Sequence, residues 1–188
     1  HVGCEKGKEV ASFLRQSIGT FSNNADRKGG RYTVLDVGTY CGYSALLLAS
    51  TIKEYAPNLD FQVISTEINP KHISVAKRMI KLGKMEEHIT IVQTGSVETA
   101  LSAEHAGPAV DFVLFDHSKS SYLRDLKTME ACGYIKKSTF VCADNVVVSE
   151  ALVTYREHVE NLEEIGIVKT ETIFGRLEYT ENLKAGYL

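Results

Sequence analysis

The chain alternates short apolar runs with stretches of helical spacing, and this alternation constrains the fold more than any other feature. Five nearly continuous runs predict strands: Thr33–Val37, Phe61–Thr66, Ile89–Gln93, Val110–Phe115 and Thr139–Ala143. Continuous apolar runs are typical of strands buried on both faces of a parallel sheet. The intervening stretches predict helices: Tyr43–Tyr55, Pro70–Leu82, Val97–Glu104, Tyr122–Ala131 and Glu150–Leu162. Strands joined by crossover helices indicate a doubly wound α/β fold.

Residues that begin and end elements support these boundaries. Asn69 can cap a helix whose first position is Pro70, and Gly83 fits the end of the same helix. Apolar residues near the C-terminus indicate further strands, with a hairpin expected around Gly175. Because the chain has no repeat, low-complexity tract or linker, we expect a single domain over residues 1–188.

Composition excludes several classes of function. The formal net charge is -3, and no block of Lys and Arg with interleaved aromatic residues predicts a nucleic-acid partner. No apolar run approaches the length of about 18 residues that a membrane span needs. The cysteines lack zinc-site spacing, so we interpret them as free thiols of a cytoplasmic protein and place the last of them in the core. They are Cys4, Cys41, Cys132 and Cys142.

In open α/β sheets, ligands bind beyond the carboxyl ends of the strands. The first strand ends in Asp36-Val37 and is followed by Gly38, where the chain can turn tightly and a ligand can approach the backbone. Tyr40 stands where the second glycine of a GxGxxG motif would be, so a dinucleotide site is disfavoured. Glu67, at the end of the second strand, can accept hydrogen bonds from ribose hydroxyls. The alternative is an ordinary turn with a solvent-facing acid near a helix N-terminus.

The fourth and fifth strands end in acidic residues that adjacent parallel strands would bring together. Asp116, Asp144 and Asn145 offer three hard oxygen ligands, which suit Mg²⁺. Lys119 lies about one helical turn beyond Asp116, where a nearby metal would favour its neutral form and let it act as a general base. The alternative makes the two aspartates helix caps and the lysine a surface residue.

Five motifs of the chain, in this order and spacing, resemble catechol O-methyltransferase: DVGTYCGYSA, STEINP, FDHSK, CADNVVV and RLEY. The resemblance runs over nearly the whole chain. It implies a Rossmann-like class I methyltransferase with a seven-stranded, mostly parallel sheet whose C-terminal strand is antiparallel. It also implies that the family's first helices lie upstream of His1.

The resemblance assigns roles to individual residues. Lys119 would be the catalytic base, and Mg²⁺ would be held by Asp116, Asp144 and Asn145. Lys119, Asn145 and Glu178 would contact the substrate. The positions matching S-adenosylmethionine contacts are Val2, Asp36, Gly38, Tyr40, Ser44, Glu67, Ile68, Ser96, Asp116 and His117.

Three positions depart from the family pattern. Ser118 stands where the family usually has Trp, and Ser149 stands where it usually has Pro. Both family residues form hydrophobic walls against a flat aromatic ring, so a wider or more polar acceptor is implied. Val97 replaces a Gln near the adenine.

The sequence therefore predicts a monomeric, Mg²⁺- and S-adenosylmethionine-dependent O-methyltransferase acting on a catechol or a similar small vicinal diol. One alternative is a methyltransferase-like binding module that has lost turnover. A second is a phenylpropanoid O-methyltransferase that uses caffeoyl-type acceptors. An NAD(P)-dependent oxidoreductase is disfavoured, because GxGxxG is absent and the acidic strand ends would be left unexplained.

Overall fold

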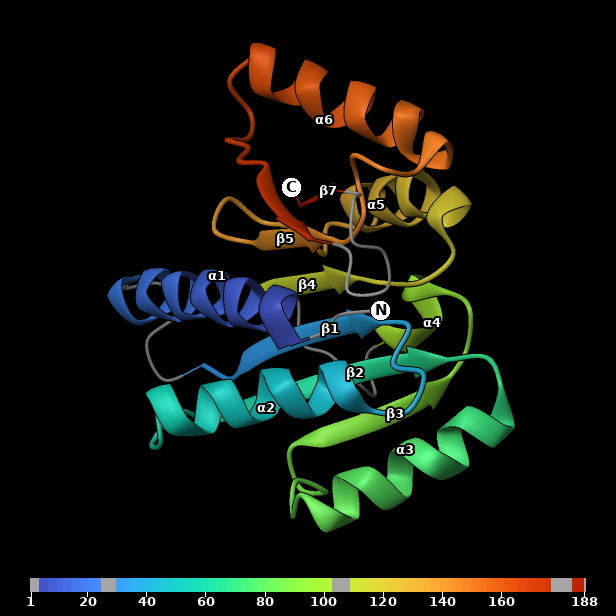
Figure 1. Cartoon of the computed structure of the whole chain (residues 1–188). Coiled ribbons are helices and arrows are strands. Elements are labelled where there is room, and N and C mark those ends of the chain that lie inside the picture. The colour runs from blue at the N-terminus through green and yellow to red at the C-terminus, as the bar shows by residue number, and fades with distance from the viewer. Residues whose placement is uncertain (1–3, 25–29, 103–108, 177–183, 188) are drawn as a thin grey trace.

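A five-stranded parallel sheet forms the centre of the computed structural model, which describes residues 4–24, 30–102, 109–176 and 184–187 (Figure 1). The strand order is β3-β2-β1-β4-β5. The sheet is doubly wound, because the order reverses between the neighbouring strands β1 and β4. The strands are β1 (Tyr32–Val37), β2 (Phe61–Glu67), β3 (Ile89–Gln93), β4 (Phe112–Phe115) and β5 (Phe140–Ala143).

Helices cover both faces of the sheet. They are α1 (Cys4–Asn23), α2 (Tyr43–Tyr55), α3 (Pro70–Leu82), α4 (Val97–Ala100), α5 (Tyr122–Ala131) and α6 (Val153–Glu164), with short 3₁₀ helices η2 (Lys119–Ser121) and η3 (Glu150–Leu152). The predicted bounds of α2, α3 and α5 are confirmed. The predicted helix at Glu150–Leu162 begins as η3 and continues as α6, whereas α4 ends four residues before its predicted end at Glu104. Helix α1 was not predicted.

Two apolar layers hold these helices against the sheet. Strand residues alternate between the layers, as Phe112 and Leu114 face one side while Val113 and Phe115 face the other. The first layer contains α1, α2 and one residue of α3, and α1 and α2 lie side by side (Figure 1). The second layer contains α4, α5 and α6. Because every sheet residue of β1 and β4 is buried, the continuous apolar runs of the sequence are explained.

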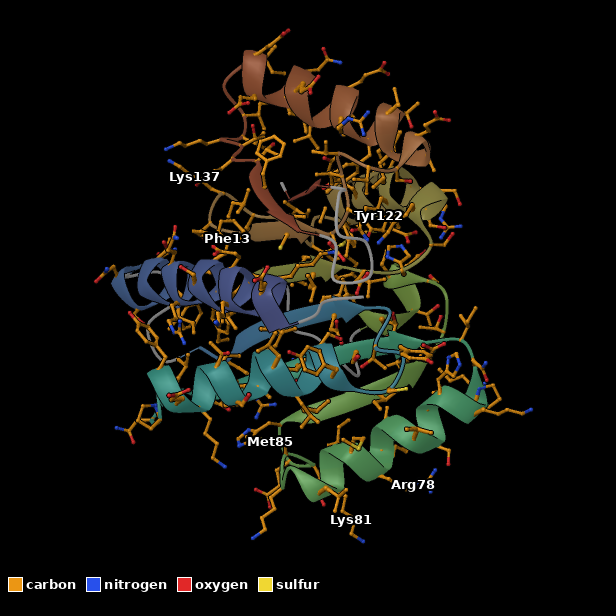
Figure 2. All side chains as sticks on the ribbon, viewed as in Figure 1. Phe13, Arg78, Lys81, Met85, Tyr122 and Lys137 are labelled. Carbon is orange, nitrogen blue, oxygen red and sulfur yellow. The ribbon has the colours of Figure 1, made fainter. Side chains whose placement is uncertain are left out.

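Helix α1 is anchored by an apolar stripe at helical spacing. Val10, Leu14, Ile18 and Phe21 are buried in the first layer. Phe13 packs between α1 and the β4–β5 pair, where its ring meets Phe112 and Phe140 edge-on at centroid distances of 5.9 and 5.0 Å (Figure 2). This packing fixes the helix over the half of the sheet that carries the acidic strand ends.

The ends of α3 follow the predicted chemistry, with one difference. The Asn69 side chain accepts a hydrogen bond from the Lys71 backbone N–H, and Pro70 occupies the first turn, as predicted. Gly83 follows the last helical residue, but its φ is -74°, and Lys84 is the residue with a left-handed φ of 54°. A Cβ at Gly83 would come within 2.7 Å of Leu46 Cδ2, so the glycine packs closely against α2 and a larger residue would have to displace the Leu46 side chain.

The C-terminal strands differ from the expected arrangement. Strands β6 (Ile173–Arg176) and β7 (Lys184–Tyr187) pair antiparallel in a separate two-stranded sheet. The expected antiparallel C-terminal strand is thus present, but in the described residues five strands, not seven, share the parallel sheet. The prediction of a turn around Gly175 is wrong, because Gly175 pairs with Ala185 inside the ladder.

Two further sequence expectations concern membranes and thiols. Among the residues the structure describes, no helix combines the length and apolarity needed to cross a bilayer. Cys41, Cys132 and Cys142 are free, and Cys142 is buried in the first layer, as expected.

Candidate active site

The carboxyl ends of β1, β4 and β5 meet at the point where the strand order reverses. In the ladder Val37 pairs with Phe115, and Phe115 pairs with Ala143. Gly38, Asp116 and Asp144 are therefore the next residues on three adjacent strands. Gly38 has φ 100°, and a Cβ there would come within 2.8 Å of the Asp116 carbonyl oxygen and 2.9 Å of His117 Cβ. Only glycine allows the turn after β1 to lie this close to the end of β4.

Asp36 is fully buried beneath this turn. Its Oδ2 accepts hydrogen bonds from Ser44 Oγ at 3.0 Å and from Ser65 Oγ at 2.7 Å. Its Oδ1 is buried and has no hydrogen-bond partner among the described residues. Burial raises the pKa of Asp36 to about 6, although the hydroxyl groups of Ser65, Ser44 and Thr39 oppose the shift. A buried carboxylate oxygen without a donor fits a cationic ligand group.

A second pair of buried polar atoms without described partners lies at the same turn and strand end. They are Thr39 Oγ1 and His117 Nδ1. The other ring nitrogen of His117, Nε2, lies 2.8 Å from Asp125 Oδ2. A carboxylate only accepts, so Nε2 carries the proton, and in the neutral ring Nδ1 is left as an acceptor. His117 can therefore take an N–H from a ligand.

The His117 ring is held from two sides. It stacks on Tyr122 with a centroid distance of 4.8 Å, and Asp125 is in turn bonded by Arg124 Nε at 2.8 Å. Burial alone would raise the pKa of Asp125, but the hydrogen bonds from His117 and Arg124 bring it below its usual value. Asp125 therefore stays ionised and keeps His117 oriented.

Glu67 accepts three backbone N–H groups, which sequence reasoning did not foresee. Oε1 accepts from Ile68 at 2.9 Å and from Asn69 at 2.8 Å, and Oε2 accepts from Tyr40 at 3.0 Å. Both lone pairs of Oε1 are then used, whereas Oε2 has one remaining. Only Oε2 can therefore accept a further donor, and Glu67 also ties the turn after β1 to the end of β2.

Tyr40, Ile68 and Ser96 lie on the loops that follow β1, β2 and β3. Tyr40 is half-exposed with φ 49°, and its ring meets the His72 ring edge-on at 4.6 Å. Ile68 is exposed, and its Cγ2 would lie 3.1 Å from a Cβ on Gly95. Ser96 Oγ accepts from Thr99 N at 3.2 Å, so it caps α4 while its hydroxyl can still donate. These three residues therefore follow three adjacent strands at the same edge of the sheet.

Lys119 stands beside the acidic strand ends, one turn beyond Asp116 as the spacing predicted. Its Nζ lies 3.3 Å from Asp116 Oδ1 and donates to Tyr122 Oη at 2.7 Å. Tyr122 is fully buried, and its hydroxyl donates to the Phe115 carbonyl at 2.6 Å. Burial raises the pKa of Tyr122, with Asp116 and Asp144 adding to the effect, so this hydroxyl stays protonated. The amine is thereby fixed in position.

Asp144 and Asn145 share a partner that sequence reasoning missed. Lys6 Nζ donates to Asp144 Oδ1 at 2.9 Å and to Asn145 Oδ1 at 2.9 Å. Burial raises the pKa of Asp144, Asp116 raises it further, and the Lys6 ammonium opposes both. Spacing could have placed Lys6 on the buried face of α1, because it precedes Val10 by four residues, but spacing does not identify the partner of the lysine.

Two expected site residues remain untested, and two departures from the family pattern can be located. Val2 and Glu178 lie outside the described residues. Ser118 is exposed and bonds Ser120, while Val97 is buried in the second apolar layer. The loop after β5 is held from α6, because Arg156 Nη1 donates to the carbonyls of Val146 and Ser149.

The candidate metal ligands are of the chemical type that a hard divalent ion prefers. The described residues contain no group of three His, Cys, Asp or Glu side chains able to hold a metal. The candidate ligands are instead two carboxylates and one amide on neighbouring strand ends, a combination of oxygen donors that suits Mg²⁺. Asp116, Asp144 and Asn145 would hold such an ion.

Comparison with known proteins agrees with this architecture. The fold matches that of an O-methyltransferase from Bacillus cereus solved in complex with SAH, with TM-score 0.69 and 19% identity over 100% of this chain and 80% of that one. The fold class is therefore that of the Rossmann-like O-methyltransferases. Residues 26–170 match the family model described as O-methyltransferase, so the chain belongs to this family.

Within this family, the chain is similar to curated catechol O-methyltransferases. Catechol O-methyltransferase B of Danio rerio is 35% identical over 130 residues, which are 68% of this chain and 47% of the relative. Catechol O-methyltransferase of Bos taurus is 29% identical over 149 residues, 78% of this chain and 48% of the relative. The expected resemblance is confirmed, and the chain spans about half the length of these two relatives.

Proposed function

We propose that the protein transfers a methyl group from S-adenosylmethionine to one oxygen of a catechol or similar vicinal diol, with Mg²⁺ bound at the acidic strand ends. The observation that carries the proposal is the position of Lys119. Its amine is held by Tyr122 and by Asp116, which is one of the three candidate metal ligands and whose backbone carbonyl lies against the Gly38 turn. Membership of the O-methyltransferase family supports the cofactor.

The polar atoms beside the turn after β1 suit the cofactor by their chemistry. Asp36 Oδ1 offers a buried carboxylate oxygen to the ammonium of the methionine part. Glu67 Oε2 can accept one ribose hydroxyl, and His117 Nδ1 can accept an adenine N–H. When bound, S-adenosylmethionine supplies an electrophilic methyl group on a sulfonium, and Mg²⁺ favours ionisation of the diol oxygens.

The chain's own contribution to the reaction is a positioned base. A neutral Lys119 amine has two N–H groups and one lone pair, and Asp116 and Tyr122 accept the two N–H groups. The lone pair is left for the hydroxyl proton of the substrate. Lys119 would take this proton at Nζ while the substrate oxygen bonded to the methyl carbon, and the methyl donor would depart as a neutral thioether.

Positioning dominates this chemistry. The nucleophilic oxygen and the sulfonium carry opposite charges that cancel as the bond forms, so strengthening those charges would accelerate the reaction little. Fixing the distance and angle of the reacting atoms is what a site can contribute. The hydrogen bonds around Lys119, Asp36 and Glu67 serve that purpose.

The test is methyl transfer from S-adenosylmethionine to a panel of catechols and caffeoyl-type diols, with Mg²⁺ or with EDTA. The expected result is a monomethylated product that disappears with EDTA and with Lys119→Ala. Preference for the caffeoyl-type acceptors would instead identify a phenylpropanoid enzyme. Cofactor binding without product from any diol would refute the enzymatic proposal in favour of a binding module.

A further inference from the structure

Lys6 is a buried cation whose surroundings differ from those of an ordinary surface lysine. Its side chain is 4% exposed, and its ammonium is within hydrogen-bond distance of three oxygens: Asp144 Oδ1 at 2.9 Å, Asp144 Oδ2 at 3.3 Å and Asn145 Oδ1 at 2.9 Å. These oxygens belong to two of the three side chains that would bind Mg²⁺. The ammonium thus contacts the atoms that a divalent ion needs.

The backbone that carries Lys6 is firmly placed. A Cβ on the next residue, Gly7, would lie 3.3 Å from Leu47 Cδ2 and 3.3 Å from Tyr43 Oη, so α1 approaches α2 closely here. The buried stripe of α1 continues from Val10 onward. The helix is therefore fixed, while the lysine side chain has four rotatable bonds and can withdraw its ammonium without moving the helix.

On the strength of the proposed metal site, we infer that Lys6 is an internal cation that occupies the Asp144 and Asn145 oxygens until a divalent ion displaces it. An ammonium and a divalent ion bound to the same oxygens would lie within about 4 Å of each other, where like charges repel strongly in a buried site. Lys6 then stabilises the metal-free loop and weakens metal affinity. Lys6 is thus a residue that sets metal affinity and not a ligand.

Direct metal binding tests the inference. Mn²⁺, which also prefers oxygen ligands, is titrated by electron paramagnetic resonance into the wild type, Lys6→Met, Lys6→Arg and the control Lys8→Met, an exposed lysine of the same helix. We expect Lys6→Met to bind Mn²⁺ at least about tenfold more tightly, the change that one displaced charge–charge contact readily produces. Lys6→Arg, which retains the charge, and Lys8→Met should stay near the wild-type affinity.

Thermal unfolding supplies an independent readout. Without metal, Lys6→Met should melt at a lower temperature than the wild type, because Asp144 loses its buried ion pair with Lys6. Saturating Mn²⁺ should close this difference, because the displaced lysine no longer stabilises the loaded protein. If Lys6→Met proves too unstable to purify, Lys6→Gln keeps a hydrogen-bond donor without the charge and should show the same tightening.

The opposite outcomes are distinct. Mn²⁺ binding to Lys6→Met and Lys6→Gln that is equal to or weaker than wild-type binding would overturn the inference alone, because Lys6 would then orient the ligands. No Mn²⁺ binding to any variant would overturn it together with the metal part of the proposed function. Titration with S-adenosylhomocysteine then tells separately whether the cofactor part of that function stands.

Discussion

Replacing Asp36 with Asn separates two consequences of burying a carboxyl group in the proposed cofactor pocket. Asn can present its carbonyl oxygen to Ser44 and Ser65, so both hydrogen bonds to Oδ2 survive. What changes is the charge and the atom at the position of Oδ1, which has no partner among the described residues. The variant should therefore fold while losing the group that would meet the ligand's ammonium.

The magnitude follows from the pKa of Asp36, which burial raises from 3.8 to about 6. The native carboxyl holds its proton more firmly than the unfolded one, so its contribution to stability is present below about pH 4 and is lost as pH rises through about 6. Two pKa units correspond to about 3 kcal/mol. At pH 7 the ligand-free Asp36→Asn protein should be more stable than the wild type by up to that amount.

Ligand binding should change in the opposite direction. An ammonium beside Asp36 favours the carboxylate, so the dissociation constant for S-adenosylhomocysteine should be constant above about pH 7. It should rise by up to about tenfold per pH unit as pH falls below 6. In Asp36→Asn this pH dependence should vanish, and binding at pH 7 should be at least about tenfold weaker.

Isothermal titration calorimetry between pH 5 and 8 measures the binding, and urea unfolding at pH 7 measures the stability. The matched control is Asp60→Asn, whose exposed side chain only pairs with Arg31 on the surface. A wild-type dissociation constant that stays level from pH 5 to 8, or an Asp36→Asn protein no more stable than the wild type, would refute this account of the pocket.

Three further substitutions test the base and the turn. Lys119→Ala should lower kcat by about two to four orders of magnitude in the methyl-transfer assay, the usual reach of a general base, whereas a rise in KM alone would show a binding role. Tyr122→Phe removes the hydroxyl that accepts from Lys119 and donates to Phe115. Steady-state kinetics should show a lower kcat with little change in KM. A change in KM as large as the change in kcat would contradict an orienting role. Gly38→Ala should lower the unfolding free energy by more than about 2 kcal/mol in urea titrations, because φ is 100° and the new Cβ would meet the Asp116 carbonyl. The control Gly19→Ala, in a helix with nothing within 4 Å of the new Cβ, should instead stabilise the protein by about 0.5–1 kcal/mol. Equal changes in unfolding free energy at the two glycines would contradict a special conformational requirement at Gly38.

The elements that sequence analysis placed well carry their own boundary signals. Helix α3 begins at Pro70 after the capping Asn69, and both features are local in sequence. Strands β1 and β4 are buried along their whole length, so most of their residues are apolar, which also leaves a local signature. Such signals need no knowledge of the tertiary structure, so the parallel sheet and its polar strand ends could be predicted.

What was missed depends on contacts between distant parts of the chain. Glu67 meets the Tyr40 backbone 27 residues away, and Lys6 meets Asp144 138 residues away. Neither partner can be read from spacing along the chain, because each depends on the path of a loop. The stripe of α1 was readable at helical spacing, but a lysine that extends such a stripe is ordinarily solvated and indicates no partner by itself.

Backbone conformation connects these long-range contacts with the proposed chemistry. Of the three described non-glycine residues with positive φ, Tyr40 at 49° and Asn145 at 64° lie on the loops after β1 and β5, beside the candidate site. Left-handed backbone costs about 1 kcal/mol or more for a residue with a side chain, so other contacts must hold it. Glu67 accepts a hydrogen bond from the Tyr40 backbone N–H, and the side-chain oxygen of Asn145 accepts one from Lys6. A cofactor ribose on Glu67 and a metal on Asn145 would engage these same two side chains, so we expect ligand binding and loop conformation to be coupled at both strand ends.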